Sequence, residues 1–173
     1  MKMIKFMAAN TSGRDFVMGD LHGCLDQLDM FLEFINFNYE NDRMFSVGDL
    51  VDRGPDSWEC LDLLNNSWFH AVKGNHEELM EDFIDNRPMG VYWFQNGGDW
   101  WRALTKEEKN VALKTIKDKV AELPLLITVV GEFHVLHAEL RSHKQLTDAD
   151  LADLDTFSTH ALEPGLDLSL LTI

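Results

Sequence analysis

The sequence predicts an α/β fold with a mainly parallel sheet. Short apolar runs typical of buried strands alternate with amphipathic helical patterns through the first half of the chain, which is the order of βαβ units. A short polar motif containing Gly and Asp or Asn follows each of three apolar runs, and open α/β sheets place their ligands at this end of their strands. Parallel strands of this kind are joined by right-handed crossovers.

Three strands and three helices alternate in the first half of the chain. The apolar residues of the first helix recur at helical spacing and should form its core face, and Ser57 is expected to cap the second helix. The expected strands cover residues 15–18, 44–47 and 68–72. The expected helices cover residues 25–36, 58–64 and 77–85.

The second half begins with a break in this pattern. Residues 87–101 combine Pro and Gly with several aromatic side chains, which predicts an aromatic-rich loop followed by a short helix, with local packing favoured over substrate contact. A capping box at Thr105 precedes a helix that reaches residue 122. Residues 125–130 and 133–137 then predict two strands joined by a tight two-residue turn, so that a β-hairpin adds an antiparallel part to the sheet.

The composition is that of one globular domain with a substantial core. The chain has 173 residues, of which 45% are hydrophobic and 26% charged, so we expect a single domain over residues 1–173. The net charge of −15 argues against nucleic acid as a partner, because binding a phosphate backbone needs basic surface. No apolar run is long enough to span a membrane, and the apolar start is too short for a signal peptide. We therefore expect a cytoplasmic protein.

The polar motifs at the strand ends predict a two-metal phosphoesterase centre. Their carboxylate and imidazole groups suit divalent cations such as Mn, Fe or Zn, and one carboxylate can bridge two ions about 3.5 to 4 Å apart. Such a pair can hold a phosphate and convert a bridging water to hydroxide near neutral pH. One motif alone is also typical of a turn or a helix start, but three in order, each after a strand, argue against that reading. The motifs are Gly19-Asp20-Leu21-His22-Gly23, Gly48-Asp49-Leu50-Val51-Asp52-Arg53-Gly54 and Gly74-Asn75-His76-Glu77.

These motifs resemble those of the metal-dependent serine/threonine phosphoprotein phosphatases, which are calcineurin-like metallophosphoesterases with phage and bacterial members. The resemblance covers about residues 15–140 and extends to Asn96-Gly97-Gly98 and His137-Ala138. It implies a four-layer α/β/β/α sandwich whose C-terminal strands are missing from this chain. It also implies two divalent cations as cofactors, with Mn²⁺ favoured and Fe or Zn as alternatives.

The resemblance assigns metal ligands to matched positions. Asp20 and His22 would bind the first cation, Asp49 would bridge the two, and Asn75 with His137 would bind the second. The residues themselves agree with this assignment, because Asn75 offers a carbonyl oxygen and His137 ends a predicted strand that points to the same edge.

The resemblance also assigns an acid/base pair and a phosphate-binding group. His76 and Asp52 match the pair: a carboxylate bonded to an imidazole holds its tautomer and raises its pKa, so that the imidazolium can protonate a leaving alkoxide. Arg53 would hold the substrate phosphate with its planar fork of donors, assisted by Asn75. The alternative, that Asp52 and Arg53 form only an ion pair in a turn, is disfavoured by their place directly after the bridging carboxylate.

Residues 141–173 depart from the family pattern. Family members carry an arginine after a tryptophan and a glycine-histidine pair in this region, and Arg141, His143 and His160 stand in no matching context. His160 is more simply a loop residue than a substitute ligand. The chain therefore reads as truncated, and the second cation is expected to bind more weakly than the first because it lacks one ligand.

The expected activity is hydrolysis of phosphoserine or phosphothreonine in proteins or peptides by direct attack of a metal-bridging hydroxide. One alternative is cleavage of dinucleoside polyphosphates such as diadenosine tetraphosphate, which the acidic residue Asp52 disfavours. Another alternative is a non-catalytic scaffold that binds phosphate without turnover.

A missing C-terminal segment would also leave a sheet edge and apolar surface exposed. We therefore expect self-association, either through that edge or by exchange of the apolar residues 168–173. Light scattering at high protein concentration should then detect dimers or larger species, and a monodisperse monomer would contradict the expectation.

Overall fold

The computed structural model describes residues 4–138, which form six strands and five α-helices. The strands are β1 (Ile4–Met7), β2 (Asp15–Met18), β3 (Arg43–Ser46), β4 (Phe69–Ala71), β5 (Leu126–Val129) and β6 (Phe133–Leu136). The α-helices are α1 (Leu25–Phe34), α2 (Ser57–Cys60), α3 (Asn75–Ile84), α4 (Trp100–Ala103) and α5 (Lys106–Thr115). Shorter helical segments are the 3₁₀ helices Leu61–Asn65 and Pro88–Asn96 and the π-helical turn Ile116–Val120.

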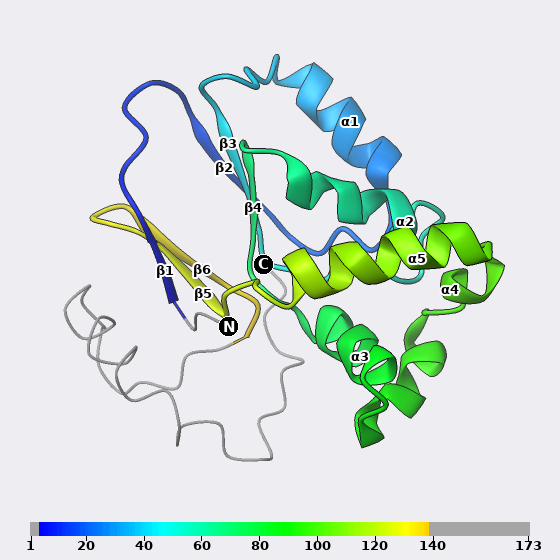
Figure 1. The fold of residues 1–173 in the computed structure, drawn as a ribbon. Helices are drawn as coiled ribbons and strands as arrows, with labels where there is room; N and C mark the ends of the chain where they lie inside the picture. The colour runs from blue at the N-terminus through cyan, green and yellow to red at the C-terminus, as the bar shows by residue number, and fades with distance from the viewer. Residues whose placement is uncertain (1–3, 139–173) are drawn as a thin grey trace.

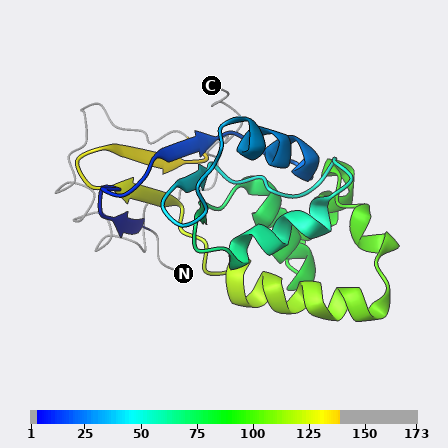
Figure 2. The same ribbon diagram turned by 90° about the horizontal axis from the view of Figure 1, so that it is seen from above.

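Two three-stranded sheets pack face to face in the described part of the chain. The first sheet has the order β2-β3-β4 with all strands parallel, and the second has the order β1-β5-β6. In the second sheet β1 runs parallel to β5, whereas β5 and β6 form an antiparallel hairpin. The helices gather on one side of the first sheet and the second sheet lies on its other side (Figures 1 and 2). The order of layers over residues 4–138 is therefore helices, parallel sheet, mixed sheet.

Two apolar clusters hold these layers together, and the alternation along β3 shows how. Met44 packs into the cluster shared with the helices, whereas Phe45, the next residue, packs into the cluster between the sheets. Successive strand residues point to opposite faces, so a strand buried on both faces reads as a continuous apolar run. The cluster between the sheets contains Phe45, Val72, Ile127, Val129 and Val135.

The expected alternation of strands and helices is confirmed, as is the hairpin near the end of the described chain. The capping box at Thr105 is present, with its hydroxyl accepting from the Glu108 amide at 3.3 Å. The helix that follows continues to residue 120 by way of the π-helical turn. All three polar motifs follow parallel strands of the first sheet, as the sequence predicts.

Three local expectations were wrong, and one strand was not predicted. The strand β1 was missed, because four residues at the start of the chain become a strand only by pairing with β5, more than a hundred residues away. The hairpin loop has three residues, 130–132, since Val129 pairs with Phe133, and Gly131 at its centre has a φ of 76°. The expected loop after residue 87 is largely the 3₁₀ helix. The second helix is capped at Asp56, not at Ser57.

The C-terminal expectations, including His160 and the apolar residues 168–173, lie outside the described residues. Within residues 4–138, no helix has the length and apolar character needed to cross a bilayer.

One partly buried imidazole lies at the contact between the two sheets. His70 on β4 has its ring centroid 5.1 Å from that of Phe45. Burial, followed by the positive charges of Lys5 and Arg43, lowers the pKa of His70 to about 4, whereas the charge of Asp15 acts in the opposite direction. His70 is therefore neutral in the folded chain at pH values where a free imidazole is already protonated.

This difference predicts an acid-sensitive fold. A free imidazole titrates near pH 6.5, so between about pH 6.5 and 4 the unfolded chain binds a proton that the folded chain does not. As the pH is lowered through this range, the free energy of unfolding should decrease by up to about 1.4 kcal/mol per pH unit. We expect His70→Gln to reduce this slope, measured by urea denaturation at several pH values. His134→Gln, at an exposed position on β6, should leave the slope unchanged, and equal slopes in both variants would refute the assignment.

Candidate metal centre

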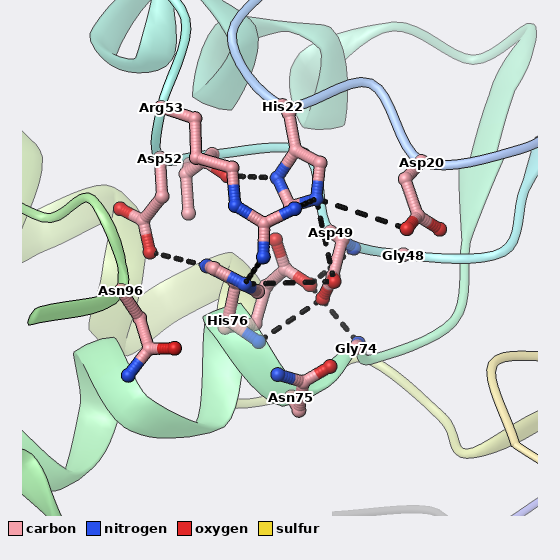
Figure 3. A network of polar contacts seen from close by, with 12 residues as sticks. Asp20, His22, Gly48, Asp49, Asp52, Arg53, Gly74, Asn75, His76 and Asn96 are labelled. Atoms are coloured by element: carbon pink, nitrogen blue, oxygen red, sulfur yellow. Dashed lines mark hydrogen bonds and ion pairs between the residues drawn. The ribbon is translucent and has the colours of Figure 1, made fainter. Parts of the chain in front are cut away.

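Four strand ends bring polar side chains to one edge of the fold. Three imidazoles surround one carboxylate oxygen, Oδ2 of Asp49: His22 Nε2 lies 3.8 Å away, His76 Nε2 3.9 Å and His137 Nε2 3.6 Å. The two sheets therefore bring together residues from all three motifs and from the end of β6. Figure 3 shows Asp49 with Asp20, His22 and His76 around it.

Backbone carbonyls fix the orientation of two of these imidazoles. The Nδ1 of His22 lies 3.0 Å from the Val51 carbonyl oxygen, and the Nδ1 of His137 lies 2.8 Å from the Val47 carbonyl oxygen. A carbonyl only accepts, so Nδ1 carries a proton and Nε2 is the ring nitrogen that faces Asp49. This is the outer support that metal-binding histidines use.

The contact between Asn75 and His137 also fits a cation. Oδ1 of Asn75 lies 2.9 Å from Nε2 of His137, and with Nδ1 bonded to a carbonyl both atoms present lone pairs to one another. Two facing acceptors need a positive charge, either a proton or a metal ion, between or beside them.

The donor set suits divalent transition metals. Two groups of three side chains have ligand atoms within 4.8 Å of one another: His22, Asp49 and His76 form one, and Asp20, Asp49 and His137 the other. Asp49 belongs to both groups, and the Asp20 carboxylate, 44% exposed, lies 3.7 Å from His22 Nε2. Mixed imidazole and carboxylate donors around a shared carboxylate fit a pair of such cations.

A buried carboxylate-imidazole pair lies directly beside this centre. Oδ2 of Asp52 is 2.7 Å from Nδ1 of His76, and the two side chains are 0% and 1% exposed. Burial lowers the pKa of His76, but the hydrogen bond to Asp52 and the charge of Asp49 outweigh it, so the net shift is upward. The geometry is that of an imidazole held ready to donate a proton.

Arg53 settles which nitrogen of His76 carries the proton. Its Nη2 is 3.0 Å from His76 Nε2, and its Nη1 is 2.6 Å from His22 Nε2 (Figure 3). A guanidinium can only donate, so Nε2 of His76 accepts and Nδ1 donates to Asp52. The exposed side chain of Arg53 thus lies at the mouth of the site, where it can reach a bound anion.

The loops that carry these groups have strained backbones. His22, Asp49, Asp52 and Arg53 have φ angles of 45°, 51°, 75° and 71°, a region that side-chain-bearing residues rarely adopt and that concentrates at functional sites. The strain is held by tertiary contacts. One is a close approach at Gly48, where a Cβ would lie 2.5 Å from the Gly74 nitrogen.

Glu77 lies at the centre of the site, although no role is predicted for it from the sequence. Its side chain is fully buried and accepts the backbone N–H groups of Asp49 and Leu50, each at 2.8 Å, and of Gly74 at 2.9 Å. Burial and the charge of Asp49 raise the pKa of the carboxyl to about 7, although the three N–H donors favour its ionised form. Glu77 therefore ties two metal-site loops together.

Two indoles were also missed as parts of the site. Trp93 and Trp100 both donate from Nε1 to the Asp52 carboxylate. The aromatic run was visible in the sequence and was interpreted as packing, but its partner is 41 to 48 residues earlier. The N–H of a buried tryptophan usually has a hydrogen-bond acceptor, and this rule was the one indication that these indoles contact a polar group.

Two packed sheets that gather imidazoles and carboxylates beside an arginine define a metal-dependent phosphoesterase. The family described as calcineurin-like phosphoesterases matches residues 16–170. The chain belongs to this family, and the expected fold class is thereby confirmed.

Known proteins with similar sequences include phosphatases of two kinds. The chain is 33% identical over 156 residues to "Serine/threonine-protein phosphatase 2" of Salmonella typhimurium, a match covering 88% of this chain and 66% of that protein. A shorter match, 42% identical over 64 residues, covers 36% of this chain and 24% of a symmetrical bis(5'-nucleosyl)-tetraphosphatase of Actinobacillus pleuropneumoniae. The matched stretches span 42 to 66% of the length of three bacterial serine/threonine phosphatases.

A solved structure shows the same fold. A protein serine/threonine phosphatase from Saccharomyces cerevisiae superimposes with a TM-score of 0.58 at 23% identity, covering 91% of this chain and 48% of the other.

The role of Glu77 in joining the loops predicts a loss of stability on neutralisation. In Glu77→Gln an amide NH₂ would face at least one backbone N–H, and a buried unsatisfied donor costs about 1 to 3 kcal/mol. Urea denaturation in the presence of a chelator should show this loss without any contribution from metal binding. Glu78→Gln, at the exposed neighbouring position, is the matched control, and equal stabilities of the two variants would contradict the role.

Proposed function

We propose that this chain hydrolyses phosphoserine and phosphothreonine monoesters in proteins or peptides. The observation that supports the proposal most strongly is the buried pair of Asp52 and His76 beside Arg53 and Asp49. A serine or threonine alkoxide is a strongly basic leaving group and needs a proton as it departs. In the proposed reaction His76, held by Asp52, supplies that proton.

Each residue would have a distinct role in this reaction. Arg53 would bind two phosphate oxygens through its planar fork, and Asn75 would add its amide group. When His76 is protonated at both ring nitrogens, Nε2 would donate its proton to the leaving oxygen, while Asp52 would hold the ring through Nδ1 and stabilise the imidazolium. In this proposal water, not a side chain, would be the nucleophile, so no phosphoenzyme is expected.

The cations would complete this arrangement. Asp20, His22 and Asp49 would hold one, and Asp49, Asn75 and His137 the other, with Mn²⁺ as our proposed metal. When bound, the two ions would supply the charge that activates water and neutralises the phosphate.

Cleavage of dinucleoside polyphosphates is the second candidate, favoured by the local similarity to tetraphosphatases. Its leaving group is a nucleotide phosphate, which is weakly basic and needs little protonation. A fully buried carboxylate that supports a proton donor is better suited to the phosphomonoester.

Substitution of the acid/base pair should separate these possibilities. With added Mn²⁺ we expect turnover of a phosphoserine peptide to exceed that of diadenosine tetraphosphate, and Asp52→Asn or His76→Asn to lower kcat on the peptide by about 10²- to 10⁴-fold. Asp29→Asn, on the exposed face of α1, is the control. Preference for the dinucleotide would favour the second candidate, and peptide binding without turnover would indicate a scaffold.

A further inference from the structure

We infer that the indole N–H groups of Trp93 and Trp100 position Asp52 so that His76 can deliver its proton to a strongly basic leaving group. The inference rests on the proposed phosphomonoester hydrolysis. It makes the two tryptophans positioning residues, which act through Asp52 and touch neither substrate nor metal.

The Asp52 carboxylate accepts from three N–H groups in fixed directions. Trp100 Nε1 lies 2.7 Å from Oδ1, Trp93 Nε1 lies 3.0 Å from Oδ1 and 2.9 Å from Oδ2, and His76 Nδ1 lies 2.7 Å from Oδ2. Its own backbone N–H donates to Ser57 Oγ at 2.9 Å. With both oxygens engaged, the carboxylate cannot rotate away from the imidazole without breaking hydrogen bonds in a buried site.

The choice of indole as donor matters chemically. A buried carboxylate needs hydrogen-bond partners, and over residues 4–138 the only ionic partner of Asp52 is His76. A lysine or arginine in place of the indoles would satisfy the carboxylate but would repel the imidazolium. An indole N–H is neutral and can only donate, so the full negative charge remains available to His76.

The aromatic segment is packed so that these donors cannot move freely. Trp93 is fully buried, and its ring meets that of Trp100 edge to face at 5.7 Å. Gly98 leaves room for the Trp93 ring, since a Cβ at Gly98 would lie 2.6 Å from a carbon of that indole. The segment is also joined to the catalytic loop, because the Arg53 amide donates to the Gly97 carbonyl at 3.3 Å. This packing holds the two indole N–H groups in place beside the acid/base pair.

This arrangement predicts an effect that depends on the leaving group. Removing an indole N–H should weaken proton delivery and leave binding of the phosphate intact. The kcat on substrates with a strongly basic leaving group should therefore fall, whereas the kcat on substrates with a weakly basic leaving group should change little. General packing damage would lower both activities equally.

Trp100→Phe and Trp93→Phe keep an aromatic ring and remove the donor. We expect kcat on a phosphoserine peptide to fall roughly tenfold or more, with less than about a threefold loss on 4-nitrophenyl phosphate and little change in KM. Trp101→Phe is the matched control, because Trp101 packs on both rings and is 9% exposed but makes no hydrogen bond to Asp52 in the described structure. Equal losses on both substrates would overturn the inference.

A second measurement does not depend on turnover. In metal-free protein the Nδ1 proton of His76 should give a downfield, slowly exchanging NMR signal, assigned by its loss in His76→Asn. The signal should shift or exchange faster in Trp100→Phe and stay unchanged in Trp101→Phe. Trp100 is used because it is half-buried and its position tolerates substitution better than that of the fully buried Trp93. An unaltered signal in Trp100→Phe would refute the positioning role, whereas a wild-type protein that turns over no phosphomonoester would refute only the proposed function.

Discussion

The site depends on one close approach, between the loop after β3 and the loop that begins α3. Gly48 and Gly74 allow the two backbones to meet, and the buried carboxylate of Glu77 bonds the amides on both sides. The Asp49 carboxylate in turn accepts the backbone N–H of His76 at 3.0 Å. Because of this junction, a metal-bridging candidate and a proton donor that are 27 residues apart in sequence become neighbours.

Three buried carboxylates in the described part of the chain have different partners, which suit three different tasks. Asp42 pairs with the Arg14 guanidinium, whose hydrogen bond keeps the pKa of that carboxyl well below its usual range, and the pair joins two loops. Glu77 is surrounded by backbone amides and serves as a structural tie. Of these three, Asp52 alone combines neutral indole donors with an imidazole. Its negative charge is therefore left for a partner that gains and loses a proton.

Much of this could be predicted from the sequence because the information is local. Each polar motif follows its own strand, so the alternation of apolar runs and polar loops was sufficient to place Asp20, Asp49 and His76 at one edge. The strand β1 and the hydrogen bonds to Asp52 from the two indoles depend on contacts between distant segments. Composition and periodicity describe neither kind of contact, because they contain no information on which segments meet.

The consecutive left-handed residues Asp52 and Arg53 have a consequence for how such a chain can evolve. Each costs of the order of 1 to 3 kcal/mol relative to a relaxed backbone, and glycine at the exposed position of Arg53 would recover part of that free energy. Selection for stability alone would therefore favour loss of the guanidinium. A long cationic side chain on a turn that suits glycine indicates a position where activity and stability are in conflict.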